Sequence, residues 1–356
     1  MKKNTLLFLI VLCASIKSFA QYYNAAFGIN GAPLKTALHN IIKNHNTQSW
    51  PLWNYFYSTD TVNGNQVWDI YSDVPMGNPP YTFILGTNQC GTYSQESDCY
   101  NHEHTWPSTF FNDASPMRTD LHHVYPTDGY VNNKRSNYPF GKVTNASWTS
   151  QNNSKLGNSN SYPGYTDKVF EPIDSFKGDI ARTYFYMSTR YENEDAGWGN
   201  WTMANGAQLT ADAITLLMNW HHNDPVSQKE IIRNNAIAQI QMNRNPFIDY
   251  PMFADCIWGS GDCTSIGLAD QHLFDGIKVY PIPSQTILHI ETPYLLSITQ
   301  VSVYDILGSK VMKQEIILPN ANKDLSLDIS HFQEGNYLLL LNTSKGVYKK
   351  LFSKNE

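Results

Sequence analysis

The chain has 356 residues, of which 41% are hydrophobic and 16% charged, and its formal net charge at pH 7 is −6. This length is too great for one ordinary hydrophobic core and predicts one sizeable domain together with a smaller one. The acidic balance argues against a protein whose affinity comes from neutralising many nucleic-acid phosphates.

Residues 1–20 have the pattern of a signal peptide, with Lys2 and Lys3 at the start, an apolar middle, and Ser18 and Ala20 before the cut. Their removal lowers the count of Lys and Arg from 25 to 22 against 31 acidic residues, a net charge of −9. No other stretch approaches the roughly 20 apolar residues of a transmembrane helix. We therefore expect an exported, soluble protein. An uncleaved N-terminal anchor is the alternative.

Two apolar segments follow. Residues 33–43 carry leucines and isoleucines at helical spacing, which predicts a first helix. Residues 50–56, WPLWNYF, have the composition of a core segment. Both are expected to pack inside the larger domain.

Four cysteines remain once the signal peptide is removed, at Cys90, Cys99, Cys256 and Cys263. An even number in an exported chain favours disulfides, and four cysteines allow three pairings. Nearness in sequence favours Cys90 with Cys99 and Cys256 with Cys263. Reduced, buried thiols are the alternative.

Chemically active side chains are most concentrated in residues 99–140, between two apolar runs. We predict strands at residues 102–106 and 120–125, followed by a helix. Thr127 or Asp128 is a natural N-cap of that helix. Residues 132, 135 and 136 then lie one to two turns in. This order is a small ββα unit, which brings a residue of the first strand against one on the helix.

The side chains of this unit suit hydrolysis assisted by one hard cation. Glu103 and Asn132 offer carboxylate and amide oxygens, and Mg²⁺ accepts one or two such ligands while keeping several waters. His104 is of the type that takes a proton from water near neutral pH. Arg135 is permanently charged, and its planar fork fits a phosphate oxygen. Together they indicate phosphodiester hydrolysis.

A zinc site is the competing interpretation. His102, His104, His122 and His123 are plausible Zn²⁺ ligands. The chain lacks the HExxH spacing that places two histidines on one helical face. On an alternating strand only one of His122 and His123 faces the site. Zinc is therefore ranked second.

Residues 141–166 are rich in Asn, Ser, Gly and Tyr and predict a loop, which could line a nucleic-acid groove through Trp148, Tyr162 and Tyr165 or be a plain surface loop.

Three helices are expected after this loop. These cover residues 178–191, a run capped by Thr210, and a run that starts at Asp224 and Pro225 and ends near residue 243. Their apolar stripes are most simply core.

Residues 261–276 predict a linker, and residues 277–356 predict a small β-sandwich of short alternating strands separated by Pro, Gly and Asn turns. An accessory binding module is one reading of such a domain. The lack of an exposed aromatic cluster makes that reading less favoured.

Several long blocks resemble the endonuclease I family of secreted bacterial nucleases, members of the ββα-metal or His-Me finger class. These are EHTWPSTFF, DLHHVYPTDGYVNNKRSNYPFG, VFEPIDSFKGDIARTYFYMSTRY and WHHNDPVSQKEIIRNNAIAQIQMNRNPFIDYP. The resemblance covers roughly residues 30–260. It implies a catalytic domain over residues 21–260 and products with 5′-phosphate ends.

Carried over residue by residue, the resemblance implies that Glu103 and Asn132 bind the cation and that His104 is the general base. The family often has Gly and Asp where this chain has Asn133 and Lys134, and often Asn at the position of His123. A further arginine assists the phosphate in some relatives. Arg118 and Arg135 are both candidates for it.

The segments VYPIPSQTILHI, VSVYDILGSKV, LDISHFQEGNYLLLL and KKLFSKNE resemble the type IX secretion C-terminal sorting domain of Bacteroidota. The resemblance covers residues 277–356. It implies passage across the outer membrane by the type IX machinery, followed by cleavage of the domain or surface attachment.

We therefore expect an α+β fold, with a ββα-metal nuclease domain of several helices followed by a small β-sandwich. The expected function is a secreted or cell-surface, largely sequence-nonspecific endonuclease. Its substrate is DNA and possibly RNA, its cation Mg²⁺ with Mn²⁺ or Ca²⁺ as alternatives, and its state monomeric. The competing functions are a zinc hydrolase built on the histidine cluster and a non-catalytic surface binding protein.

Overall fold

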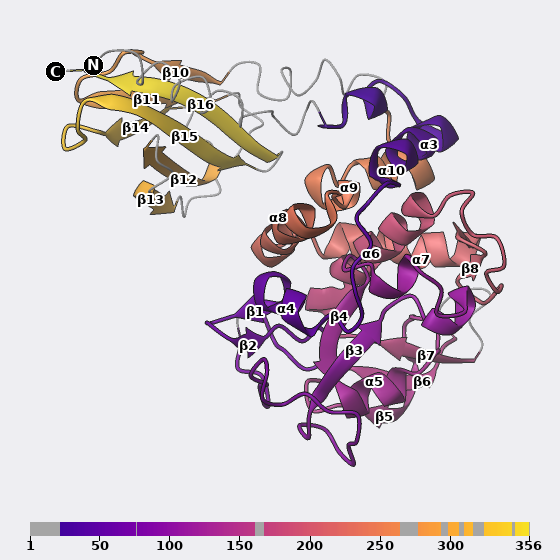
Figure 1. Ribbon diagram of the computed structural model, residues 1–356. Coiled ribbons are helices and arrows are strands. Elements are labelled where there is room, and N and C mark those ends of the chain that lie inside the picture. The colour runs from indigo at the N-terminus through magenta and orange to yellow at the C-terminus, as the bar shows by residue number, and fades with distance from the viewer. Residues whose placement is uncertain are drawn as a thin grey trace, which may run out of the picture. The chain divides into compact units, whose positions relative to one another are not determined.

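The computed structural model in Figure 1 describes residues 22–75, 77–160, 167–263, 277–292, 298–305, 310–315, 324–343 and 346–355. The chain divides into two compact units, with the boundary between Thr264 and Ser265. The predicted signal peptide and residues 264–276 of the predicted linker lie outside the described residues. Within these ranges, no helix is both long enough and apolar enough to cross a bilayer.

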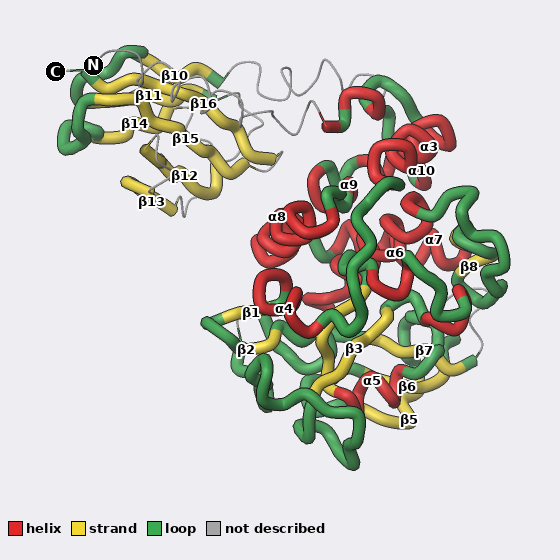
Figure 2. Tube along the Cα trace, in the orientation of Figure 1, coloured by secondary structure: helices red, strands yellow, loops and turns green. Residues whose placement is uncertain are grey.

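The larger unit combines many helices with short strands, drawn red and yellow in Figure 2. Its α-helices are α3 (Gly31–Ile42), α4 (Trp53–Thr59), α5 (Gly129–Arg135), α6 (Lys177–Arg190), α7 (Ala211–Asn223), α8 (Gln228–Gln241), α9 (Pro246–Asp249) and α10 (Phe253–Trp258). Short 3₁₀ helices are η1 (Asn24–Ala26), η2 (Ser108–Phe111), η3 (Met117–Thr119) and η4 (Asp174–Phe176). Its strands are β1 (Thr61–Val62), β2 (Gln66–Val67), β3 (Tyr100–His104), β4 (Val124–Asp128), β5 (Asn145–Thr149), β6 (Lys155–Asn158), β7 (Lys168–Glu171), β8 (Ala204–Asn205) and β9 (Gln208–Leu209).

Helix α6 is buried over nearly its whole surface. The helix expected at residues 178–191 buries its apolar stripe as predicted, and Ile180, Tyr184 and Met187 on that stripe are each at most 1% exposed. Burial extends to the polar side because α3, α7 and α9 also pack against this helix. There the buried Arg182 forms an ion pair with Glu230 of α8, with Nε 2.5 Å from Oε1. A buried charge of this kind requires such a partner.

The expected helices after α6 are present, with one corrected boundary. Thr210 caps α7 as predicted, and its hydroxyl accepts a hydrogen bond from Ala213 N at 3.3 Å. Helix α8 starts at Gln228 rather than at residue 225. The reason is a capping box, in which Ser227 and Glu230 each accept the other's backbone N–H.

The predicted loop at residues 141–166 is partly wrong. Strands β5 and β6 lie within it and form a three-stranded antiparallel sheet with β7, which follows the loop. Strand β5 exposes four of its five residues, so the hydrophobic alternation that marks a strand in sequence is missing. Trp148 lies on β5, whereas Tyr162 and Tyr165 lie outside the described residues.

The smaller unit contains two antiparallel sheets, ordered β10-β11-β14 and β13-β12-β15-β16. Its strands are β10 (Lys278–Tyr280), β11 (Ile287–Glu291), β12 (Ile298–Asp305), β13 (Lys310–Glu315), β14 (Asp324–Asp328), β15 (Gly335–Thr343) and β16 (Gly346–Lys354). Buried residues of both sheets, among them Leu288, Val303 and Leu339, form one hydrophobic cluster. Two sheets facing a shared core make a small β-sandwich.

Candidate active site

A β-hairpin followed directly by a helix organises the part of the larger unit where the candidate residues lie. Strands β3 and β4 are antiparallel, with Tyr100 opposite Asp128 and His104 opposite Val124. Helix α5 begins at Gly129 with no intervening loop and packs against both strands. The expected order of strand, strand and helix is therefore present.

The strand boundaries differ from those expected at residues 102–106 and 120–125. Strand β3 starts two residues earlier, and β4 starts at Val124. Residues 120–123 form a turn instead. The backbone N–H of Leu121 donates there to Gln241 Oε1 of α8, at 2.6 Å. That contact joins residues 120 positions apart in sequence, so no local sequence pattern predicts it.

Asp128 is the N-cap of α5, which decides between the two capping residues predicted. Its Oδ1 accepts hydrogen bonds from Tyr130 N at 2.8 Å and Val131 N at 2.9 Å. The helix ends at Arg135, and Ser136 follows with a φ of +50°. Asn132 and Arg135 are thus on the helix as expected, whereas Ser136 lies just past its end.

Glu103 points from β3 into the interior and is 2% exposed. Its Oε1 accepts a hydrogen bond from Tyr71 Oη at 2.7 Å and lies 3.2 Å from Arg135 Nη1. Burial raises the pKa of Glu103 to about 7, although Arg135 and Tyr71 act in the opposite direction. Within the described chain, Oε2 accepts no protein hydrogen bond. One carboxylate oxygen is therefore held by the protein while the other stays available.

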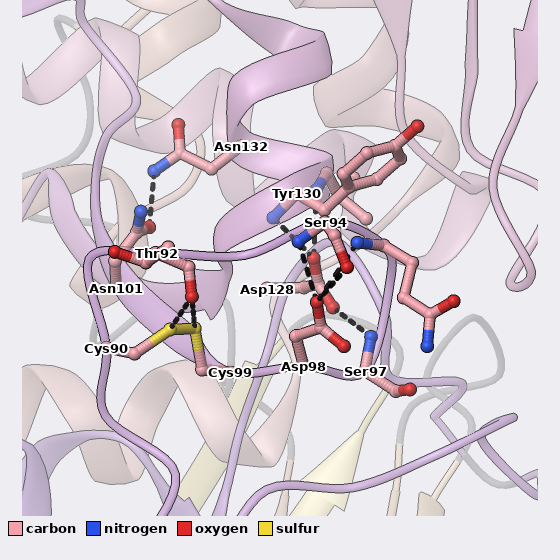
Figure 3. The surroundings of a disulfide bond; sticks show 12 residues. Cys90, Thr92, Ser94, Ser97, Asp98, Cys99, Asn101, Asp128, Tyr130 and Asn132 are labelled. Carbon is pink, nitrogen blue, oxygen red and sulfur yellow. Dashed lines mark hydrogen bonds between the residues drawn. A yellow bond between two sulfur atoms is a disulfide. The ribbon is translucent and has the colours of Figure 1, made fainter.

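Asn132 has a fixed amide orientation. Its Nδ2 donates to Asn101 Oδ1 at 2.8 Å, as drawn in Figure 3, and to the His102 carbonyl at 3.1 Å. Two acceptors on one side identify that atom as nitrogen and turn Oδ1 the other way. Within the described ranges, Oδ1 has no protein donor. Asn132 thus presents an amide oxygen, the atom type a hard cation takes.

His104 leaves β3 on the face opposite to Glu103, as strand alternation requires. Its Nε2 lies 2.9 Å from the Arg118 carbonyl, and its ring is near Phe111 and His123. A carbonyl only accepts, so Nε2 carries the proton and Nδ1 carries the lone pair. Burial lowers the pKa of His104. The imidazole is therefore neutral at pH 7, with Nδ1 as its basic atom.

The two candidate arginines are in different environments. Arg135 is 1% exposed, and besides Glu103 its guanidinium donates to the carbonyls of His104 at 3.2 Å and Thr105 at 2.5 Å. Arg118 is exposed, and its backbone carbonyl is the one that contacts His104. The structure thus buries Arg135 beneath the hairpin and leaves the Arg118 guanidinium at the surface.

The four clustered histidines do not converge. His102 accepts a hydrogen bond from Leu52 N at 3.2 Å, and His123 donates from Nε2 to the Met117 carbonyl at 2.7 Å. Burial lowers the pKa of each of these, and of His122, to about 3. Among the residues described, no three His, Cys, Asp or Glu side chains gather to hold a metal. The alternative four-histidine zinc site is therefore not formed there.

Two contacts of the site were missed by sequence reasoning. Tyr71, from a segment 32 residues before Glu103, supplies its hydroxyl to the carboxylate. Asn101 fixes the Asn132 amide. The alternation of β3 places Asn101 and Glu103 on one face, so the sequence could have indicated that Asn101 belongs to the site. No local sequence pattern indicated Tyr71.

Both disulfides favoured by sequence nearness are present, and one of them closes a loop against α5. Cys90 and Cys99 are bonded, with Cα atoms 5.6 Å apart. Within the loop, Ser97 N donates to Asp128 Oδ2 at 2.7 Å, as Figure 3 shows. At its end, Gly129 N donates to the Cys99 carbonyl at 2.9 Å. The loop therefore holds the start of the helix that carries Asn132.

Removing either disulfide is expected to lower stability by a similar amount, but only removal of the Cys90–Cys99 bond is expected to lower activity as well. The bond between Cys256 and Cys263 closes a loop of similar length, with a sequence separation of 7 against 9. Replacing either pair by alanine should lower the free energy of unfolding by about 2–3 kcal/mol. Only loss of Cys90 and Cys99 should lower nucleic-acid cleavage at least about 10-fold, because it loosens α5. Equal activity losses in the two double variants would contradict this role.

Comparison with known proteins follows the same division of the chain. The family model described as Endonuclease I matches residues 30–252, and the one described as Secretion system C-terminal sorting domain matches residues 278–354. An extracellular ribonuclease of Bacillus amyloliquefaciens is 34% identical over 248 residues, covering 67% of this chain and 78% of the relative. An extracellular ribonuclease of Bacillus subtilis (strain 168) is 33% identical with the same coverage. A periplasmic deoxyribonuclease of Aeromonas hydrophila is 30% identical over 134 residues, or 37% of this chain and 48% of the relative.

Proposed function

Because the chain belongs to the Endonuclease I family, we propose that it hydrolyses phosphodiester bonds of DNA, and also of RNA, with the help of one divalent cation. It is a nuclease that is secreted or held at the cell surface. The observation that supports a cation is a pair of oxygen atoms, Glu103 Oε2 and Asn132 Oδ1. Both are held in place, and neither accepts a hydrogen bond from the described part of the protein.

The donor set fits Mg²⁺ best, with Mn²⁺ or Ca²⁺ as alternatives. One carboxylate and one amide oxygen are few ligands, which suits a cation that keeps several waters. Glu103 and Asn132 would hold it. When bound, the cation supplies positive charge that stabilises the phosphate and its leaving oxygen.

His104 is proposed as the general base. Its Nε2 is occupied by the Arg118 carbonyl, so Nδ1 is the atom that takes a proton from water. The water oxygen then forms a bond to phosphorus while the bond from phosphorus to the 3′ oxygen breaks. The products are a 5′-phosphate end and a 3′-hydroxyl end, whose proton comes from solvent.

The two arginines are proposed to have separate roles. The Arg118 guanidinium is exposed and its residue already contacts His104, so it is placed to bind a phosphate oxygen of the substrate. Arg135 acts through Glu103, by balancing the buried carboxylate and holding it in place. Arg135 could contact the phosphate itself only if substrate binding exposed its guanidinium.

The substrate is proposed to be cut with little sequence preference. Relatives of this chain are named as a ribonuclease and as a deoxyribonuclease, and we propose that this chain acts on both polymers. The C-terminal unit serves export and contacts the secretion machinery.

The expected test result is a changed metal requirement in Glu103→Gln. An amide lacks the negative charge of the carboxylate, so the Mg²⁺ concentration for half-maximal cleavage should rise at least about 10-fold. Cleavage of labelled DNA and RNA across a Mg²⁺ titration measures this. Glu334→Gln, an exposed site in the smaller unit, is the matched control. A folded Glu103→Gln protein with the wild-type Mg²⁺ requirement would overturn the assignment.

A further inference from the structure

Trp50 lies at the surface beside the candidate general base, although the sequence predicted it as core. It is 40% exposed, whereas Leu52 and Phe56 of the same segment are fully buried. Its ring centroid is 5.8 Å from that of His104, with an interplanar angle of 18°. The Arg118 guanidinium carbon lies 4.9 Å from the centroid of the same ring.

The segment that carries Trp50 is anchored to β3. His102, two residues before His104, accepts the backbone N–H of Leu52 at 3.2 Å. The His102 ring also contacts Trp50, with centroids 4.3 Å apart, and Trp53 at 3.7 Å. The exposed tryptophan is therefore held in one place relative to His104. A fixed aromatic surface costs little entropy when a ligand binds it.

An exposed Trp and Arg beside the proposed general base, His104, are side chains suited to binding an unpaired nucleobase. Bases stack on aromatic rings and on guanidinium planes whatever their sequence. The chain carries a net charge of −6, so phosphate neutralisation alone gives it little affinity for nucleic acid. Stacking supplies affinity that does not depend on net charge. It also places the strand so that its phosphate lies beside Arg118 and His104.

We propose that Trp50 and Arg118 form a subsite for an unpaired nucleobase next to the scissile phosphate. This rests on the proposed nuclease function and adds a substrate preference to it. A paired base in a duplex is already stacked and cannot occupy the subsite without leaving its helix. The chain therefore favours single-stranded DNA and RNA, or unpaired positions in a duplex.

The test compares two single-stranded 12-mers with the same phosphates. One is oligothymidylate, and the other has an abasic unit at every position. Fluorescence anisotropy of labelled oligomers, with the full chain in EDTA, measures binding without cleavage. One stacked base is expected to make wild-type binding to oligothymidylate about 5- to 100-fold tighter than to the abasic oligomer.

The variants separate stacking from charge. Trp50→Ala should remove most of the preference for oligothymidylate, and Trp50→Phe should keep much of it. Arg118→Ala should weaken binding of both oligomers, because it removes a phosphate contact as well. Tyr57→Ala, which removes another aromatic residue 45% exposed on α4, is the control and should keep the wild-type preference.

Two results would overturn the subsite. One is a wild-type protein with no preference between the oligomers. The other is a folded Trp50→Ala protein that keeps the wild-type preference. Neither decides the proposed function, which is judged by cleavage of oligothymidylate when Mg²⁺ is added to the wild type. Cleavage with an unchanged preference in Trp50→Ala rejects only the subsite, and no cleavage by the folded wild type rejects the nuclease mechanism.

Discussion

Replacing His104 by alanine is expected to lower kcat/KM for nucleic-acid cleavage by about 10²- to 10⁴-fold, the usual contribution of a general base. The lone pair on Nδ1 is lost, and water must then attack without a positioned proton acceptor. The side chain is half-buried at the end of β3 and makes one hydrogen bond, so the protein should still fold. Initial rates on a labelled oligonucleotide and a thermal melt measure the two effects.

His222 provides the matched control for this variant. It is an exposed histidine on α7, with Nε2 2.8 Å from Asp255 Oδ1, and it takes no part in the candidate site. His222→Ala should keep the wild-type rate. A folded His104→Ala protein with wild-type cleavage would remove His104 from the mechanism.

Replacing Arg135 by methionine is expected to lower the free energy of unfolding by about 3–5 kcal/mol, because one partner of a buried ion pair disappears. Glu103 would keep its Tyr71 hydrogen bond but lose its charge partner. The His104 and Thr105 carbonyls would lose the hydrogen bonds from Arg135 as well, although Thr105 keeps the one from the Tyr184 hydroxyl. Urea unfolding in EDTA measures the change without a contribution from bound cation.

Arg118→Ala is the contrasting variant, because its guanidinium is exposed. Its stability should stay within about 0.5 kcal/mol of wild type while cleavage falls. If Arg118→Ala instead lost stability and kept cleavage, the roles proposed for Arg118 and Arg135 would be exchanged. A fully stable Arg135→Met protein that has lost cleavage would assign the phosphate contact to Arg135.

The sequence was sufficient where a feature depends on neighbours in the chain. Asp128 caps α5 by bonding to the next turn, and Thr210 does the same for α7. The type of the capping residue and its position before an apolar run predict such contacts. The two disulfides also join close neighbours in sequence.

Features set by distant residues could not be predicted. The start of β4 depends on Gln241 of α8, which holds the turn at residues 120–123. The environment of Glu103 depends on Tyr71, and the position of Trp50 depends on His102. The apolar composition of residues 50–56 suggested a buried segment, yet composition does not say which face of the segment remains open.

The roles of the site residues remain predictions, although their placement supports a division of labour. Glu103 lies on the face of β3 that packs against α5, the helix that carries Asn132, and His104 leaves the other face. In the proposed mechanism, a substrate phosphate meets them at the end of the strand, beside the exposed Arg118.

Nicking of supercoiled plasmid by the full chain tests the central claim most directly. The protein is first stripped with EDTA and then assayed with and without added Mg²⁺. We predict no nicking in EDTA and restored nicking with Mg²⁺. Nicking that persists in EDTA, or a folded chain that fails to nick with Mg²⁺ present, would contradict metal-dependent phosphodiester hydrolysis at this site.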